Sequence, residues 1–154
     1  MTPDQRSLIR KLKKAAEQRL EAAVYLMEGR RFNRDAFDLS GYSVELSLRA
    51  AILSATPLKK YSMVWDLLAK QGAKGHDFEY LKDLFQRIRF GLRLRGEVKL
   101  PKDRVVFERT VRENWMRVAT WSTSFRYEVG YVATEDAEAF LTAARSIMES
   151  LART

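Results

Sequence analysis

The chain has 154 residues, of which 46% are hydrophobic and 31% charged, and it carries a net charge of +8 at pH 7. This length and balance exclude a disordered or fibrous protein and predict one domain, over residues 1–154, that buries a core of its own. The chain has no cysteine, which excludes disulfides, thiolate metal sites and cysteine nucleophiles and favours a reducing compartment.

No stretch of the sequence approaches the roughly 18 consecutive apolar residues of a membrane span. Basic residues also interrupt the N-terminal segment where a signal peptide would need an apolar core. They are Arg6, Arg10, Lys11, Lys13 and Lys14. We therefore expect a cytoplasmic protein that does not contact a membrane.

Apolar residues at spacings of three and four predict a long amphipathic helix from Asp4 to Glu28, ended by Gly29. A second helix is expected from Asp35 to Ser54, closed by Thr56 and Pro57. Apolar side chains surround most of this second helix, so we expect it to be the most buried one. Its small residues predict that a neighbouring helix can approach it closely. They are Ser40, Gly41, Ser43 and Ser47.

A shorter helix is predicted from about Ser62 to Gln71, because Gly72 and Gly75 follow it. Asp77 is a good N-cap for a fourth helix, since its carboxylate can accept the free backbone N–H groups of the first turn. This fourth helix is expected to end between Gly91 and Gly96.

Residues 97–103 are predicted to form a loop before a fifth helix that carries Trp115, and residues 105–107 fit a brief extended segment. Thr134 is predicted as the N-cap of the last helix. The result is an all-α fold, an antiparallel up-and-down bundle of about five to six helices. Five aromatic residues are predicted to fill its core or a dimer interface. They are Trp65, Trp115, Trp121, Phe125 and Tyr127.

The segment from Ala36 to Ala50, AFDLSGYSVELSLRA, resembles the second helix of HEPN domains. That helix typically carries an Ala, a Gly-Tyr pair, an apolar residue, Glu and Leu, and then Leu-Lys/Arg-Ala. Three further features follow the order of the family. They are the end of the first helix at residues 29–32, the step at residues 75–77, and Arg126-Tyr127 ahead of the last helix.

The resemblance covers nearly the whole chain and implies an antiparallel helical bundle that is often a homodimer. Members of the family act as metal-independent ribonucleases, as partners of nucleotidyltransferases in toxin–antitoxin pairs, or as noncatalytic RNA or nucleotide binders. The resemblance does not choose among these roles. It also allows the chain to be part of a defence system. An acidic protein such as a nucleotidyltransferase therefore remains an alternative partner to RNA.

The ribonuclease members share an arginine followed, after four to six residues, by a histidine. The only histidine here is His76, and Lys70, not an arginine, stands six positions before it. Two glycines separate them, so a shared helical face is not expected. Whether the chain is an enzyme stays open, with His76, Glu45, Arg126 and Tyr127 as catalytic candidates. The alternative for His76 is a histidine at a helix start with no chemical role.

Four polar residues of the predicted second helix lie on one ridge, because their spacings are four, three and four. They are Asp38, Tyr42, Glu45 and Arg49. One interpretation is that Glu45 pairs with Arg49 or Arg126 and compensates a partly buried charge. The other is that Asp38, Glu45 and Arg126 line a pocket or a dimer interface.

The densest basic segment has seven cations against two acidic residues and suits contact with an RNA backbone. The cations are Arg87, Arg89, Arg93, Arg95, Lys99, Lys102 and Arg104. A second basic surface is predicted from the first helix and the turn after it. Its members are Arg6, Arg10, Lys13, Lys14, Arg30, Arg31 and Arg34. RNA or another polyanion is the leading partner, and no metal or cofactor is expected because the usual ligand motifs are missing.

Overall fold

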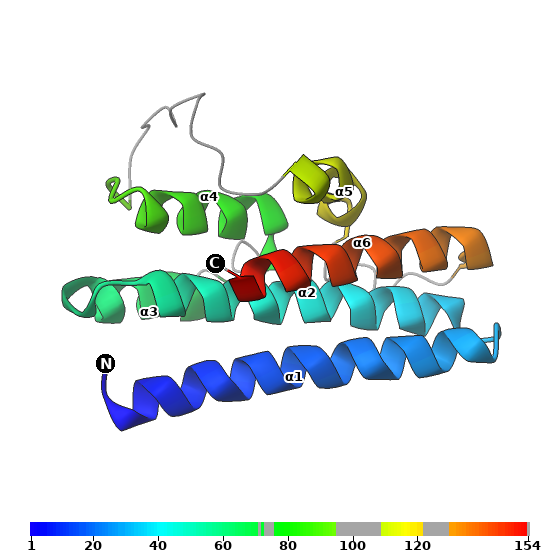
Figure 1. Ribbon diagram of the computed structural model, residues 1–154, viewed down its shortest axis with the longest axis horizontal. Coiled ribbons are helices and arrows are strands. Elements are labelled where there is room, and N and C mark those ends of the chain that lie inside the picture. The colour runs from blue at the N-terminus through cyan, green and yellow to red at the C-terminus, as the bar shows by residue number, and fades with distance from the viewer. Residues whose placement is uncertain (71, 73–75, 95–108, 122–129, 154) are drawn as a thin grey trace.

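The computed structural model describes residues 1–70, 72, 76–94, 109–121 and 130–153, with the backbone alone at 109–111. Within these ranges every regular element is a helix, which confirms the all-helical class for the described residues (Figure 1). The elements are α1 (Pro3–Glu28), α2 (Asn33–Ala55), the short 3-10 helix η1 (Leu58–Lys60), α3 (Tyr61–Ala69), α4 (Phe78–Arg89), α5 (Arg109–Ala119) and α6 (Thr134–Arg153).

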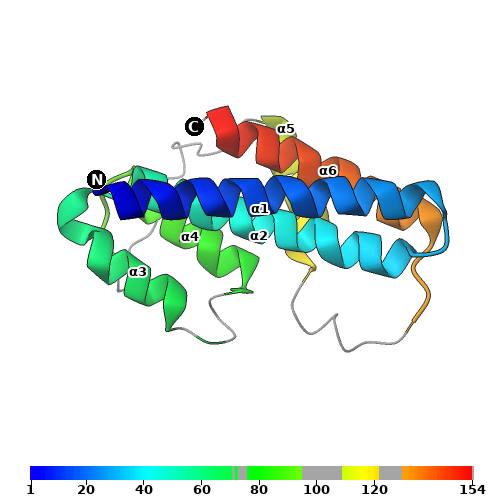
Figure 2. The same cartoon turned by 90° about the horizontal axis from the view of Figure 1, so that it is seen from below.

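The long helix α1 begins at Pro3, one residue before the predicted Asp4, because Thr2 and Gln5 form a capping box. The Thr2 hydroxyl accepts from the backbone N–H of Gln5 at 3.2 Å, and the Gln5 side chain accepts from the backbone N–H of Thr2 at 2.8 Å. The chain then reverses through residues 29–32, where Arg30 adopts a positive φ of 51°. As a result α1 and α2 lie side by side along their lengths (Figures 1 and 2).

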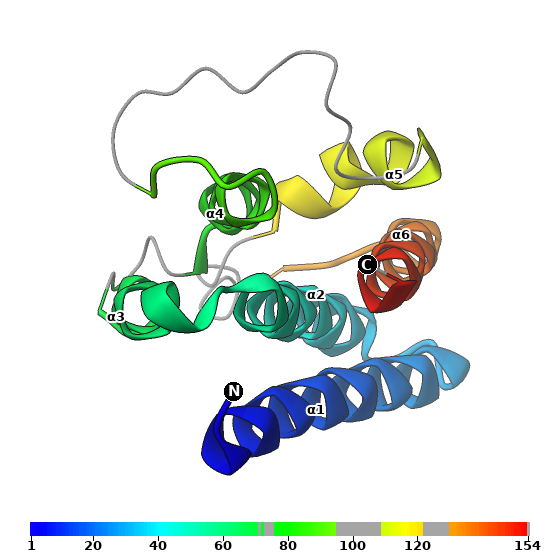
Figure 3. The ribbon, with the colours of Figure 1, turned by 60° about the vertical axis from the view of Figure 1, so that its left-hand side comes forward.

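Helix α2 occupies the centre of the fold, in contact with α1, α3, α4 and α6 (Figure 3). This position explains why apolar residues surround most of its circumference, and it confirms the prediction that this helix is the most buried. Val44, Leu48, Ile52 and Leu53 have no exposed surface and belong to the main hydrophobic core. Burying each such side chain contributes about 1.5 to 3 kcal/mol to the stability of the fold.

The small residues of α2 predict that a neighbouring helix can approach it, but at Gly41 it is a side chain, the indole of Trp121, that lies directly against the helix backbone. Trp121 follows the end of α5 and is 2% exposed. Its ring stacks on Phe78 with the centroids 5.1 Å apart and meets Tyr42 edge-on at 5.0 Å. A β-carbon at position 41 would overlap the indole, so only glycine allows this packing.

Two predicted helix starts have different outcomes. The prediction for Asp77 is confirmed, since its carboxylate accepts from the backbone N–H of Tyr80 at 3.0 Å. The prediction for Thr134 is wrong by one position, because α6 begins at Thr134 itself. The Thr134 hydroxyl accepts instead from the side-chain amide of the buried Asn33 at 3.0 Å, which ties the start of α6 to the start of α2.

The prediction that Trp65 fills the core is wrong, because this side chain is 41% exposed. Helix α3 buries Val64, Leu67 and Leu68 along one face, and Trp65 lies outside that face. A role for Trp65 in an interface between copies stays a prediction. Trp115 and Trp121 are buried as expected, at 6% and 2% exposure.

The predicted loop at 97–103, the extended segment at 105–107 and the aromatic residues Phe125 and Tyr127 lie outside the described residues. Among the helices that are described, none has the length and apolar character needed to cross a membrane.

The packing of Trp121 against Gly41 predicts that Gly41→Ala destabilises the fold, by about 1 to 3 kcal/mol in urea unfolding followed by circular dichroism. Alanine has the higher helix propensity by about 1 kcal/mol, so a loss of stability must come from the overlap with the indole. In a Trp121→Ala background the same substitution should be neutral or stabilising. An unchanged or higher stability of Gly41→Ala in the wild-type background would contradict this account of the packing.

Candidate functional site

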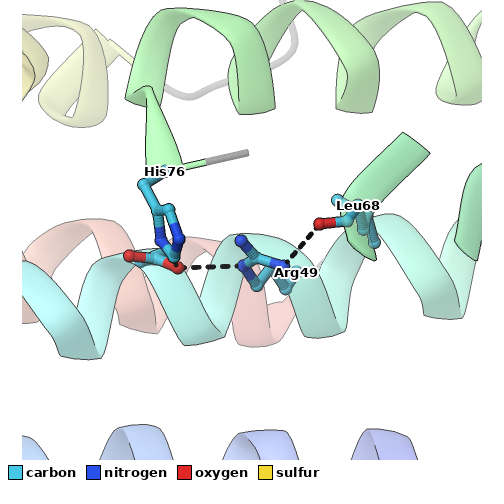
Figure 4. Close-up of polar contacts among 4 residues, drawn as sticks. Arg49, Leu68 and His76 are labelled. Atoms are coloured by element: carbon cyan, nitrogen blue, oxygen red, sulfur yellow. Dashed lines mark hydrogen bonds and ion pairs between the residues drawn. The ribbon is translucent and has the colours of Figure 1, made fainter. Parts of the chain in front are cut away.

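A buried carboxylate, that of Glu45, lies at the centre of the candidate site. Its side chain is 5% exposed and belongs to the middle of α2. One oxygen, Oε1, accepts from Nε of Arg49 at 3.0 Å and contacts Nδ1 of His76 at 2.8 Å (Figure 4). The other oxygen, Oε2, is buried and has no hydrogen-bond partner in the described part of the chain.

Arg49 stands one turn further along α2, so the i to i+4 spacing places its guanidinium beside the Glu45 carboxylate. Its Nη1 donates to the backbone carbonyl of Leu68, near the end of α3, at 3.1 Å (Figure 4). The Arg49 side chain is 16% exposed. It therefore compensates the buried carboxylate and connects α3 to α2, which confirms the predicted pairing of Glu45 with Arg49.

His76 reaches the same carboxylate from the segment that precedes α4. The two residues after it are both anchored, since Asp77 caps α4 and Phe78 is 1% exposed. These anchors direct the imidazole back toward α2. The ring of His76, at the start of α4, is thus held by Glu45, and whether the residue has a chemical role stays a prediction.

The His76 side chain is 39% exposed, so the ring is held on one side and reachable on the other. When the ring is neutral, Nδ1–H donates to the Glu45 carboxylate and Nε2 is left as an acceptor. A carboxylate that fixes the tautomer and orientation of a histidine in this way prepares it to accept a proton from a bound group. This is the chemistry that the arrangement can support.

The ridge predicted along α2 does not converge on one site. Asp38 pairs with Arg34 on its own helix, at 3.8 Å, and the ring of Tyr42 packs against Trp121. The structure thus brings together Glu45, Arg49 and His76. Arg126 and Tyr127, the two other candidates predicted beside Glu45, lie outside the described residues.

Lys70, which stands where the ribonuclease pattern has its arginine, does not contact His76. Its ammonium group pairs with Asp66 of α3 at 3.0 Å, and its side chain is 72% exposed. This agrees with the expectation that Lys70 and His76 share no helical face.

The basic segment is described only as far as residue 94. Arg87 donates to Asp83 at 2.6 Å and to the carbonyl of Arg93 at 3.0 Å. Arg89 and Arg93 are exposed and make no ion pair with any described residue. Four of the predicted RNA-contacting residues lie outside the described ranges, namely Arg95, Lys99, Lys102 and Arg104.

The contact between Glu45 and His76 was missed at the sequence level, because the two residues are 31 positions apart and separated by helix breaks. The only signals were a buried acidic residue on α2 and a histidine directly before an N-cap. Among the described residues, no group of three or more potential ligands could hold a metal ion.

Replacing Glu45 by leucine is expected to cost about 3 to 5 kcal/mol of unfolding free energy, because Arg49 would keep a largely buried charge without its carboxylate. The double substitution Glu45→Leu with Arg49→Met should recover most of that loss, since it removes both charges. Urea unfolding checks both variants. As a control, Asp66→Ala breaks the exposed pair with Lys70 and should cost about 0.5 kcal/mol or less. Equal losses for the single and double variants would contradict the pairing.

Comparison with known proteins adds no relative: the chain matches no protein-family model, no curated protein and no solved structure.

Proposed function

We propose that this chain is a HEPN-like module, an antiparallel helical bundle that binds RNA through cations that the fold leaves uncompensated. One observation carries the proposal. In the described part of the chain, none of the six basic side chains of α1 makes an ion pair, and neither do Arg89 and Arg93. The six are exposed and are Arg6, Arg10, Lys11, Lys13, Lys14 and Arg19.

Other cations of the described residues are paired with acidic residues, unlike those of α1, Arg89 and Arg93. Arg34, Arg49, Lys70, Lys82 and Arg87 each pair with an acidic residue three or four positions away. Exposed cations without such partners attract polyanions, because each neutralised phosphate releases condensed counterions.

The resemblance to HEPN domains favours RNA as the polyanion. It also supports a cytoplasmic homodimer in a defence or toxin–antitoxin system as the setting. The alternative partner is an acidic protein such as a nucleotidyltransferase, which the same cations would attract.

Binding to a single-stranded RNA should therefore weaken steeply with salt. The triple variant Lys13→Gln, Arg89→Gln, Arg93→Gln should lower the affinity and reduce the slope of log K against log salt by about 0.7 for each phosphate that is no longer neutralised. Fluorescence anisotropy at several salt concentrations measures both. Lys70→Gln is the matched control, because it removes an exposed cation that is already paired.

Binding that does not respond to salt, or a triple variant that binds like the wild type, would contradict the RNA proposal. Copurification of a stoichiometric acidic protein without nucleic acid would favour the alternative partner.

The Glu45–His76 contact supports a second candidate function, that of a metal-independent ribonuclease. With its Nδ1–H directed at Glu45, His76 can accept the proton of a ribose 2′-hydroxyl at Nε2. The 2′-oxygen then attacks the adjacent phosphorus, and the bond to the 5′-oxygen breaks. The products are a 2′,3′-cyclic phosphate and a 5′-hydroxyl that takes its proton from solvent. Arg49 positions Glu45 in this scheme and does not contact the phosphate.

If the chain cleaves RNA, His76→Ala should lower the rate of cleavage by about 100-fold or more while leaving RNA binding intact. The assay is cleavage of a labelled RNA in the presence of a chelator, with analysis of the product termini. Lys70→Ala should cleave like the wild type, since Lys70 is outside the Glu45 cluster. Equal cleavage by wild type and His76→Ala, or none by either, would eliminate this candidate.

A further inference from the structure

A surface pocket of about 190 Å³ lies where four helices meet near the end of α6. Helix α2 has α1 on one side and α4 on the other (Figures 1 and 3). Residues of these three helices and of the end of α6 line the pocket. Three apolar side chains form the inner surface, one each from α2, α4 and α6. They are Ala51, Phe85 and Leu151, all at most 8% exposed.

The two basic surfaces predicted separately from the sequence meet at the rim of this pocket. Lys13 belongs to the basic surface of α1, and Arg89 belongs to the basic segment at the end of α4. Both are exposed, and neither makes an ion pair with a described residue. A negatively charged chain that contacts both Lys13 and Arg89 therefore lies against this pocket.

The size and lining of the pocket fit one planar ring. A cavity of about 150 Å³ is enough to hold a benzene ring, so 190 Å³ admits a ring with polar substituents. Glu17 and Ser54 also line the pocket. A carboxylate disfavours a phosphate inside but can accept from the amino and imino N–H groups of a nucleobase.

We infer that this pocket seats one unstacked base of a single-stranded RNA, while the flanking phosphates contact Lys13 and Arg89. The inference rests on the proposed RNA-binding function and adds how the bound strand is held. Proteins that bind single-stranded RNA gain affinity by placing splayed bases against apolar or aromatic side chains. Here the apolar lining is provided by the largely buried Ala51, Phe85 and Leu151.

The test compares two RNA backbones of the same length and charge. One is a fully abasic ribose-phosphate hexamer, and the other is identical but carries a single adenine in the middle. In fluorescence anisotropy at fixed salt, the wild type should bind the adenine-bearing strand roughly five- to a hundredfold more tightly. Ser54→Leu narrows the pocket without changing charge and should remove this preference.

Ala22→Leu is the matched control, because it adds an equally large side chain at an exposed position of α1 away from the pocket. It should keep the adenine preference, and circular dichroism should show both variants to be as helical as the wild type. Equal binding of the two strands by the wild type, or a preference that survives Ser54→Leu, would overturn the base pocket and leave RNA binding standing. Failure to bind either strand would overturn both proposals.

Discussion

The carboxylate of Glu45, buried in the middle of the central helix α2, determines where Arg49 and His76 lie. An ionised carboxylate at 5% exposure is stable only when cations or hydrogen-bond donors compensate it. Arg49 and His76 do so through a single oxygen, and Arg49 in turn holds the Leu68 carbonyl. One carboxylate therefore connects α2 to the end of α3 and to the start of α4. The position of the imidazole follows from its hydrogen bond to that buried carboxylate.

Apolar packing also holds the start of α4 against α2. The missing side chain of Gly41 lets the indole of Trp121 lie on α2, and the indole stacks on Phe78. Phe78 is two residues after His76, so the position of the tryptophan also fixes where the imidazole-bearing segment meets α2. A polar contact and an aromatic stack thus define the start of α4 together, and a change at Gly41 is expected to disturb both.

Local patterns made much of the fold predictable. Helical periodicity predicted the helices, and the apolar residues all round residues 35–54 predicted that α2 lies at the centre. The i to i+4 spacing predicted the pairing of Glu45 with Arg49. The Glu45–His76 contact could not be predicted, because the two residues are 31 positions apart and belong to different elements. The sequence could not decide between the core and an interface for Trp65, because α3 has only nine residues and periodicity alone does not show which of its faces is covered.

Helix α4 carries features of both functional proposals, but at opposite ends. His76 lies just before its first residue and Arg89 is its last, and twelve helical residues span about 18 Å. A single nucleotide held at Arg89 does not cover that distance, so a ligand can occupy the pocket without touching the imidazole. The proposed binding and the proposed cleavage are therefore separable. Under the two proposals, an RNA long enough to follow α4 would contact both ends of the helix, whereas a short one would be bound without reaching His76.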